Sequence, residues 1–195
     1  MPILLLLALT SALSAVEETA INPSRVVDSK TIQTITEIGG HSVPVDIGLA
    51  GIATPKTNEA PDSERLARTA LHSVLATGKQ SGKLSPVILG KAGDRFERDE
   101  RGRILAIISF PRATPTLSMG EPETVGQPAL KVQPGESLQE YMVRSGWAVL
   151  NPDSNLPKDL KERLANLQKA ASDADVGLWK DYRGAMEHIF VKSGP

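Results

Sequence analysis

The feature that most constrains the fold is a run of strand-forming segments in the first third of the chain. Residues 25–28 and 31–38 are rich in Val, Ile and Thr, and residues 42–52 resume an alternating apolar pattern. Gly39 and Gly40 separate the last two segments, where a tight hairpin turn needs residues that tolerate positive φ angles. The pattern predicts a β-meander, in which consecutive antiparallel strands are neighbours in one sheet.

A helical pattern and two more strand patterns follow the meander. Asp62 is expected to be the N-cap of a helix of about four turns that ends near Gly78. Residues 85–89 and 104–110 are predicted strands, and they are joined by a charged arm whose turn lies at residues 100–102. This arrangement extends the predicted sheet to five strands.

The second half of the chain supplies the remaining helices. A short helix is predicted from Leu138 to Val143, residues 147–150 form a short buried strand, and a third helix runs from Pro157 to just before Gly177. The order of these segments predicts a mainly β fold with packed helices (α+β). We expect a five-stranded OB-type barrel with three helices outside it. A chain of 195 residues is long enough for one such domain.

Both ends of the chain are expected to lie outside the folded domain, and one internal segment is expected to be an irregular insertion in it. Residues 1–15 hold no charged side chain and an apolar run that ends in small residues, which is typical of a secretory signal peptide. Residues 16–24 are a predicted linker and residues 184–195 a predicted C-terminal tail. Residues 111–134 hold five prolines and form an irregular insertion that a protein partner can contact. The domain is therefore predicted over residues 25–183, in a secreted or periplasmic protein that is not inserted in a membrane once its signal is removed.

The composition excludes several classes of site. The chain has no cysteine, which excludes disulfide scaffolds, zinc-thiolate sites, iron-sulfur clusters and thiol catalysis. Its formal net charge of -1 argues against a polybasic protein that binds nucleic acid through bulk charge. His41, His72 and His188 share no spacing typical of metal ligands. The sequence also lacks a phosphate-binding P-loop, a dinucleotide glycine motif and the residue order of a Ser/His/Asp triad.

Five short motifs occur in an order that is characteristic of one family. Residues 25–32 are similar to R-V-x-D-G-D-T, residues 49–56 to L-x-G-I-D-[AT]-P-E, and residues 99–103 to D-x-Y-G-R. Residues 143–148 are similar to L-V-R-x-G-x-A, and residues 177–179 to G-[LI]-W. The chain therefore resembles the staphylococcal-nuclease-like (thermonuclease) domains, whose fold is a five-stranded OB-type barrel with three helices.

This resemblance implies calcium-dependent phosphodiester hydrolysis, but most of the residues that perform it are replaced. Active members hold calcium with two aspartates, orient the attacking water with a glutamate and bind the phosphate with two arginines. Lys30 and Ala53 stand at the two aspartate positions, and Lys56 stands at the glutamate position. Gly48 replaces one arginine, and Arg103 retains the other.

The replacements reverse the charge expected at this site. Two Asp, one Glu and two Arg carry a net charge of -1, whereas the five residues found here carry +3. A protonated lysine has no lone pair to offer a hard cation. We therefore expect no catalytic residue, no metal and no cofactor here, and we expect Lys30, Lys56 and Arg103 to form one anion-binding site. The alternative is that Lys30 and Lys56 are ordinary solvated residues at strand ends.

These observations predict an exported protein that binds an anion or a protein partner and has no nuclease activity. Single-stranded nucleic acid is one candidate anion, bound weakly, because stacking aromatics are scarce. Trp147 and Trp179 are expected in the core, which leaves Phe96 as the most exposed ring. One alternative is a calcium-dependent phosphodiesterase with a rebuilt site. A second alternative is a structural subunit of a larger assembly.

Overall fold

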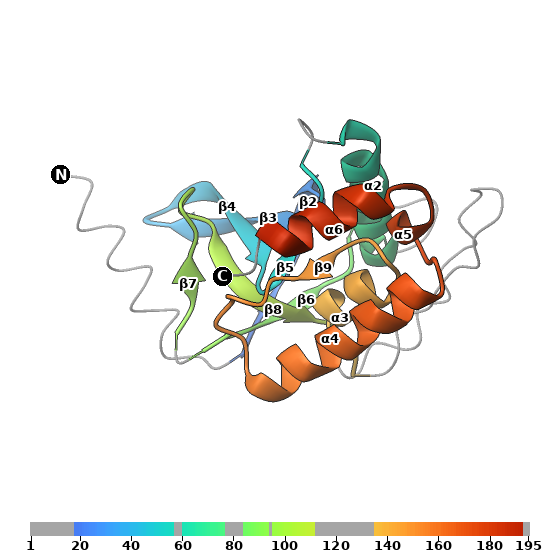
Figure 1. Cartoon of the computed structure of the whole chain (residues 1–195). Coiled ribbons are helices and arrows are strands. Elements are labelled where there is room, and N and C mark those ends of the chain that lie inside the picture. The colour runs from blue at the N-terminus through green and yellow to red at the C-terminus, as the bar shows by residue number, and fades with distance from the viewer. Residues whose placement is uncertain (1–17, 57–59, 77–83, 94, 112–134, 193–195) are drawn as a thin grey trace.

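The computed structural model describes residues 18–56, 60–76, 84–93, 95–111 and 135–192 (Figure 1). The predicted signal segment lies outside these ranges, as does the proline-rich insertion apart from Pro111. Within the described ranges, no helix combines the length and the apolar character needed to cross a membrane.

Most strands belong to one curved sheet with the order β1-β6-β8-β4-β3-β2, and β7 pairs with β8. All of its ladders are antiparallel except the parallel pairing of β4 with β8. Two further short strands, β5 and β9, pair with each other in a separate sheet. The strands are β1 (Glu18–Ile21), β2 (Pro23–Asp28), β3 (Thr31–Ile38), β4 (His41–Leu49), β5 (Ile52–Ala53), β6 (Val87–Gly90), β7 (Glu97–Arg98), β8 (Ile104–Ser109) and β9 (Val149–Leu150).

The two ends of this strand order are consecutive in the chain. Only Asn22 separates β1 from β2, yet β1 pairs with β6 and β2 pairs with β3. One bent segment therefore contributes to both edges of the sheet. No described ladder joins β1 to β2, so the strands do not form a barrel closed by hydrogen bonds all the way round. The mixed α+β architecture with an OB-like curved sheet agrees with the prediction, although the sheet has seven strands instead of five.

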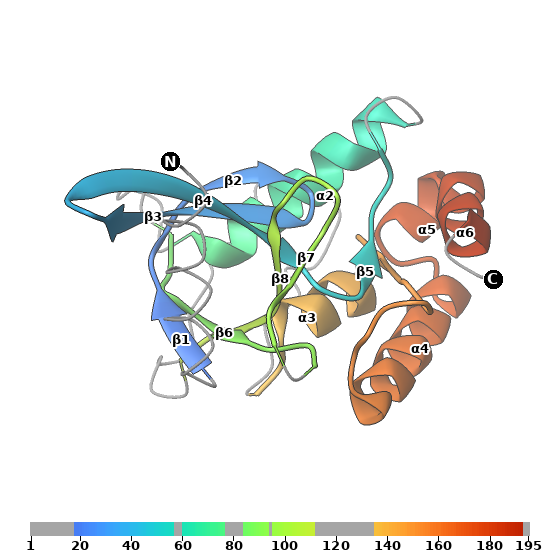
Figure 2. The same cartoon turned by 90° about the vertical axis from the view of Figure 1, so that its left-hand side faces the viewer.

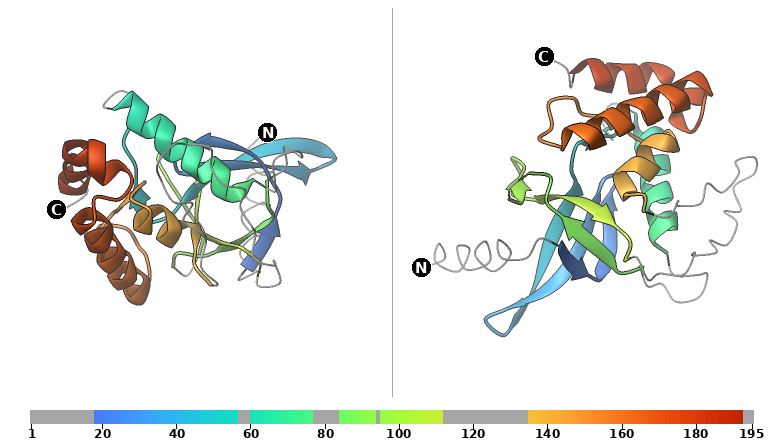
Figure 3. Two further views of the ribbon diagram at one scale, coloured as in Figure 1. Left: turned by 90° about the vertical axis from the view of Figure 1, so that its right-hand side faces the viewer. Right: turned by 90° about the horizontal axis from the view of Figure 1, so that it is seen from below.

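The helices gather on one side of the sheet, and the β3–β4 hairpin projects away from them (Figures 2 and 3). Three helices lie where the sequence predicts them, and two short helices follow near the C-terminus of the described chain. In the described parts of the chain, the helices are α2 (Pro61–Leu75), α3 (Leu138–Arg144), α4 (Lys158–Asp173), α5 (Leu178–Asp181) and α6 (Arg183–Lys192).

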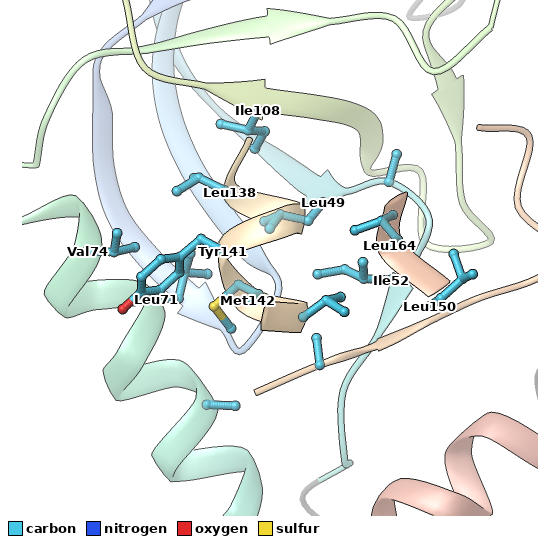
Figure 4. Packing of buried hydrophobic residues seen from close by; sticks show 14 of the residues in the cluster. Leu49, Ile52, Leu71, Val74, Ile108, Leu138, Tyr141, Met142, Leu150 and Leu164 are labelled. Atoms are coloured by element: carbon cyan, nitrogen blue, oxygen red, sulfur yellow. The ribbon is translucent and has the colours of Figure 1, made fainter. Parts of the chain in front are cut away.

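Helix α3 occupies the centre of the core. Its Leu138 and Met142 are fully buried and lie between the sheet and α2 (Figure 4). A buried glutamine of the same helix, Gln139, accepts a hydrogen bond from the Ile108 N–H at 3.1 Å and donates one to the Ala106 carbonyl at 2.7 Å. The Ala106 carbonyl also accepts a hydrogen bond from the Ala50 N–H at 2.9 Å, so Gln139 supplies a second donor to it. The two bonds of Gln139 fix α3 against β8.

Two of the family-like motifs meet at the end of α3. Gly146 has a φ of 71° and Gly177 a φ of 60°, both in the left-handed region that favours glycine. The Leu178 N–H donates to the Gly146 carbonyl at 3.0 Å, and a Cβ on Gly146 would overlap the carbonyl of Val176. The glycines of these motifs are therefore required by the close approach of two chain segments.

Several predicted element boundaries were wrong, for identifiable local reasons. Helix α2 begins at Pro61 with Ala60 as its N-cap, so Asp62 lies inside the first turn and does not cap the helix. The strand predicted over residues 42–52 is divided into β4 and β5, because Gly51 has a φ of 74° that an extended strand does not contain.

The chain also has regular structure outside the range that the sequence assigns to the domain. Strand β1 lies in the predicted linker, where pairing with β6 compensates for its polar composition. Helix α6 lies in the predicted C-terminal tail, with Met186 fully buried. Of the aromatic residues, Trp179 is buried as predicted, whereas Trp147 and Phe96 are partly buried against the core.

Candidate functional site

The three predicted anion-binding residues lie on three different segments that converge at one end of the sheet. Lys30 lies in the turn between β2 and β3, Arg103 lies immediately before β8, and Lys56 follows β5. Figure 2 shows the strands β2, β3, β5 and β8 from which these segments extend. A buried hydrogen bond of 2.6 Å between Ser29 Oγ and Thr54 Oγ1 connects the β2–β3 turn to the end of β5. This bond holds the turn that carries Lys30 next to the segment that leads to Lys56.

Lys30 is half-buried among charged side chains. Burial lowers the pKa of Lys30 below its ordinary value, and the positive charges of Arg103 and Lys56 lower it further, while Asp28 and Asp99 act in the opposite direction. The backbone of Lys30 is fixed, because its N–H donates to Asp28 Oδ1 at 2.9 Å and its carbonyl accepts from the Leu49 N–H at 2.8 Å. The fold therefore places Arg103 and Lys56 within electrostatic range of Lys30.

Arg103 is already engaged by neighbouring groups of the protein. Its Nε and Nη2 atoms both lie 2.6 Å from Asp99 Oδ2. Its Nη1 atom donates to Asp28 Oδ2 at 3.0 Å and to Thr31 Oγ1 at 2.7 Å. Only 14% of the Arg103 side chain is exposed. Arg103 is thus a structural centre that holds two carboxylates, and little of its hydrogen-bonding capacity faces outward.

Asp99 shapes the loop that carries Arg103. Its Oδ1 atom accepts hydrogen bonds from the N–H groups of Arg101 and Arg103, both at 3.0 Å. Burial alone would raise the pKa of Asp99, but the hydrogen bonds and the charge of Arg103 outweigh burial and hold that pKa below its ordinary value. The turn is completed by Gly102, whose φ is 77°. The Asp99 carboxylate thus fixes both the backbone and the side chain of Arg103.

The match to known proteins is at the level of a family. The family model described as staphylococcal nuclease homologue matches residues 46–181, well over half of the chain. The chain belongs to the staphylococcal nuclease homologue family. Among curated proteins, none matches the sequence. The family match begins within β4, so it contains Lys56 and Arg103, while Lys30 precedes it and is joined to the site by the fold.

Two other positions of the staphylococcal nuclease motif carry small residues. Gly48 lies in β4, where it is buried and pairs with Leu105 of β8 and Thr31 of β3. A Cβ built on Gly48 would lie 3.0 Å from Leu105 Cδ2, so a longer side chain needs that leucine to move. Ala53 is half-buried in β5. Neither position offers a polar side chain to a ligand.

The structure adds Asp28, Asp99 and Thr31 to the site that the sequence predicted. The residues at the five family positions carry a charge of +3, whereas the structure places the carboxylates of Asp28 and Asp99 among the three cations. Together these five charged groups leave one net positive charge. The sequence contains a signal for the role of Asp99, the first residue of the D-x-x-G-R segment. An aspartate four residues before an arginine in a tight turn can accept hydrogen bonds from that arginine.

Proposed function

We propose that this member of the staphylococcal nuclease homologue family is an exported protein that binds a phosphate-type anion at Lys30 and Lys56 and does not hydrolyse nucleic acid. Arg103 contributes its charge and holds the surrounding loops. Binding is weak and sensitive to salt, because partly exposed cations attract an anion without a dry pocket around it.

The observation that carries this proposal is the electrostatic state of Lys30. Lys30 is half-buried, the charges of Arg103 and Lys56 act on it, and none of the described carboxylates forms an ion pair with it. Asp28 and Asp99, the carboxylates whose charges act on Lys30, are bound to Arg103. A buried charge without a partner is costly. An anion between Lys30 and Lys56 removes that cost.

The donors around this position do not fit calcium. Calcium takes six to eight oxygen ligands, typically from several carboxylates. Within the parts of the chain that the structure describes, no cluster of three or more His, Asp or Glu side chains is placed to hold a metal ion. The carboxylates of Asp28 and Asp99 already accept hydrogen bonds from Arg103, and Lys30 and Lys56 repel a divalent cation. We expect saturating calcium to leave the melting temperature unchanged.

A titration of inorganic phosphate and of a short single-stranded oligonucleotide tests the proposal. Wild type is compared with Lys30→Gln and Lys56→Gln at low and moderate salt, and Lys158→Gln is the matched control because it removes one exposed charge from α4. We expect both site variants to lose affinity and the control to behave as wild type. Equal isotherms for all four proteins, or no binding at low salt, would leave the two lysines as ordinary solvated residues.

A nuclease assay distinguishes the proposal from the calcium-dependent alternative. Wild type is incubated with single-stranded DNA and excess calcium beside a variant that carries Lys30→Asp, Gly48→Arg, Ala53→Asp and Lys56→Glu. We expect no cleavage by wild type. Calcium-dependent cleavage by wild type that disappears in Asp28→Asn would show a rebuilt active site.

A further inference from the structure

A cavity of about 460 Å³ lies between helix α6 and the end of strand β5. Pro55, Gly184, Ala185, His188 and Ile189 line it. Its volume is within the range of pockets that hold small organic molecules. Most of the lining is apolar, and the His188 imidazole supplies a polar group. The cavity therefore suits a compact ring or hydrocarbon group with a polar substituent.

The position of this cavity relative to the cations indicates the class of ligand. Pro55 directly precedes Lys56, whose charge acts on Lys30, so one short segment connects the cavity to the proposed anion site. Helix α6 begins at Arg183, after the family match ends at residue 181. One wall of the cavity thus lies beyond the residues that match the family model.

The start of α6 is held firmly against the domain. Arg183 donates to the Ser172 carbonyl at 2.7 Å and to Asp175 Oδ1 at 2.6 Å, and its guanidinium carbon lies 5.5 Å from the centre of the Trp179 ring. Met186 is fully buried on the same helix. These contacts fix Gly184 and Ala185, so the wall that they form is part of the folded domain.

We propose that the cavity binds the apolar part of a small organic anion, such as an aryl phosphomonoester, whose charged group pairs with Lys56 and Lys30. This inference rests on the proposed anion site and adds the chemical class of its ligand. An inorganic ion lacks the apolar group that would fill the cavity.

Phenyl phosphate and inorganic phosphate are the probes that test this proposal. Burial of the ring predicts that phenyl phosphate binds about tenfold more tightly than inorganic phosphate. Gly184→Leu fills the cavity, and it should remove this tenfold difference while phosphate still binds. The substitution is compatible with the fold, because a Cβ on Gly184 has no neighbour within 4 Å and leucine favours a helix more than glycine does.

The control and a spectroscopic readout separate the cavity from the anion site. Ala165→Leu adds an exposed side chain to α4 and should retain the tenfold difference. In NMR spectra, the Ala185 methyl and His188 ring signals should shift with phenyl phosphate and not with inorganic phosphate. Equal affinities for the two probes in wild type, or an undiminished difference in Gly184→Leu, would overturn the cavity proposal and leave the anion site intact. If neither phenyl phosphate nor inorganic phosphate binds, the proposed anion site itself is overturned.

Discussion

The contact between Arg103 and Asp99 permits a sharp test of how burial sets the strength of an ion pair. These residues are four apart in sequence, and Arg103 Nη2 lies 2.6 Å from Asp99 Oδ2. Lys169 and Asp173 on α4 have the same spacing in sequence and the same N–O distance of 2.6 Å. The pairs differ in exposure: the side chains are 14% and 20% exposed in the first pair, and 76% and 64% in the second.

The expected coupling energies follow from this difference. Water and ions screen an exposed helical pair, which typically contributes about 0.3–0.5 kcal/mol. A mostly buried pair with several charge-assisted hydrogen bonds loses more when one partner is removed, and its members should couple by about 2 kcal/mol in a double-mutant cycle. We therefore predict at least a fourfold larger coupling energy for Arg103 and Asp99 than for the α4 pair.

Urea unfolding at pH 7 measures both cycles. One cycle combines Arg103→Met with Asp99→Asn, which retains an oxygen that can accept the Arg101 and Arg103 N–H bonds, and the control cycle combines Lys169→Met with Asp173→Asn. The pKa of Asp99 in the folded protein is below its ordinary value of 3.8, so the contribution of the Asp99 carboxylate to the free energy of unfolding is complete above pH 3.8. It should disappear as the pH falls through the lowered pKa. Equal coupling energies for the two pairs would refute the argument from burial.

Three further substitutions test other parts of the structure by urea unfolding. Leu164→Ala removes a fully buried side chain of α4 and should cost about 2–5 kcal/mol. Ser137→Ala removes the capping box that Ser137 forms with Glu140 at the start of α3 and should cost about 1 kcal/mol, whereas Ser137→Asp should retain most of that stability. Lys30→Met should stabilise the protein at neutral pH, because the folded state lowers the pKa of Lys30 and so disfavours its charged form. This advantage should shrink as the pH rises through the lowered pKa towards the ordinary value of 10.5, and a pH-independent difference would contradict the electrostatic explanation.

The sequence by itself determined the elements whose signals are local. Strand β3 occupies residues 31–38 as predicted, since its β-branched residues favour an extended strand and the Gly39-Gly40 turn ends it. Helix α4 follows Pro157 as predicted, because proline is tolerated at a helix start and the apolar residues repeat at helical spacing. The motifs also identified the family and the positions of Lys30, Lys56 and Arg103.

Only the tertiary structure decided which groups these residues meet. Arg103 contacts Asp28 across 75 residues of sequence, and this contact depends on how the β2–β3 turn and the β7–β8 turn are placed by strand pairing. Strand β1 pairs with β6 although its own sequence resembles a linker, and the cavity beside Pro55 exists because α6 packs against a distant segment. Local sequence patterns encode backbone periodicity and turns. Burial, charge pairing and cavities arise from contacts between distant segments, which have no local signature.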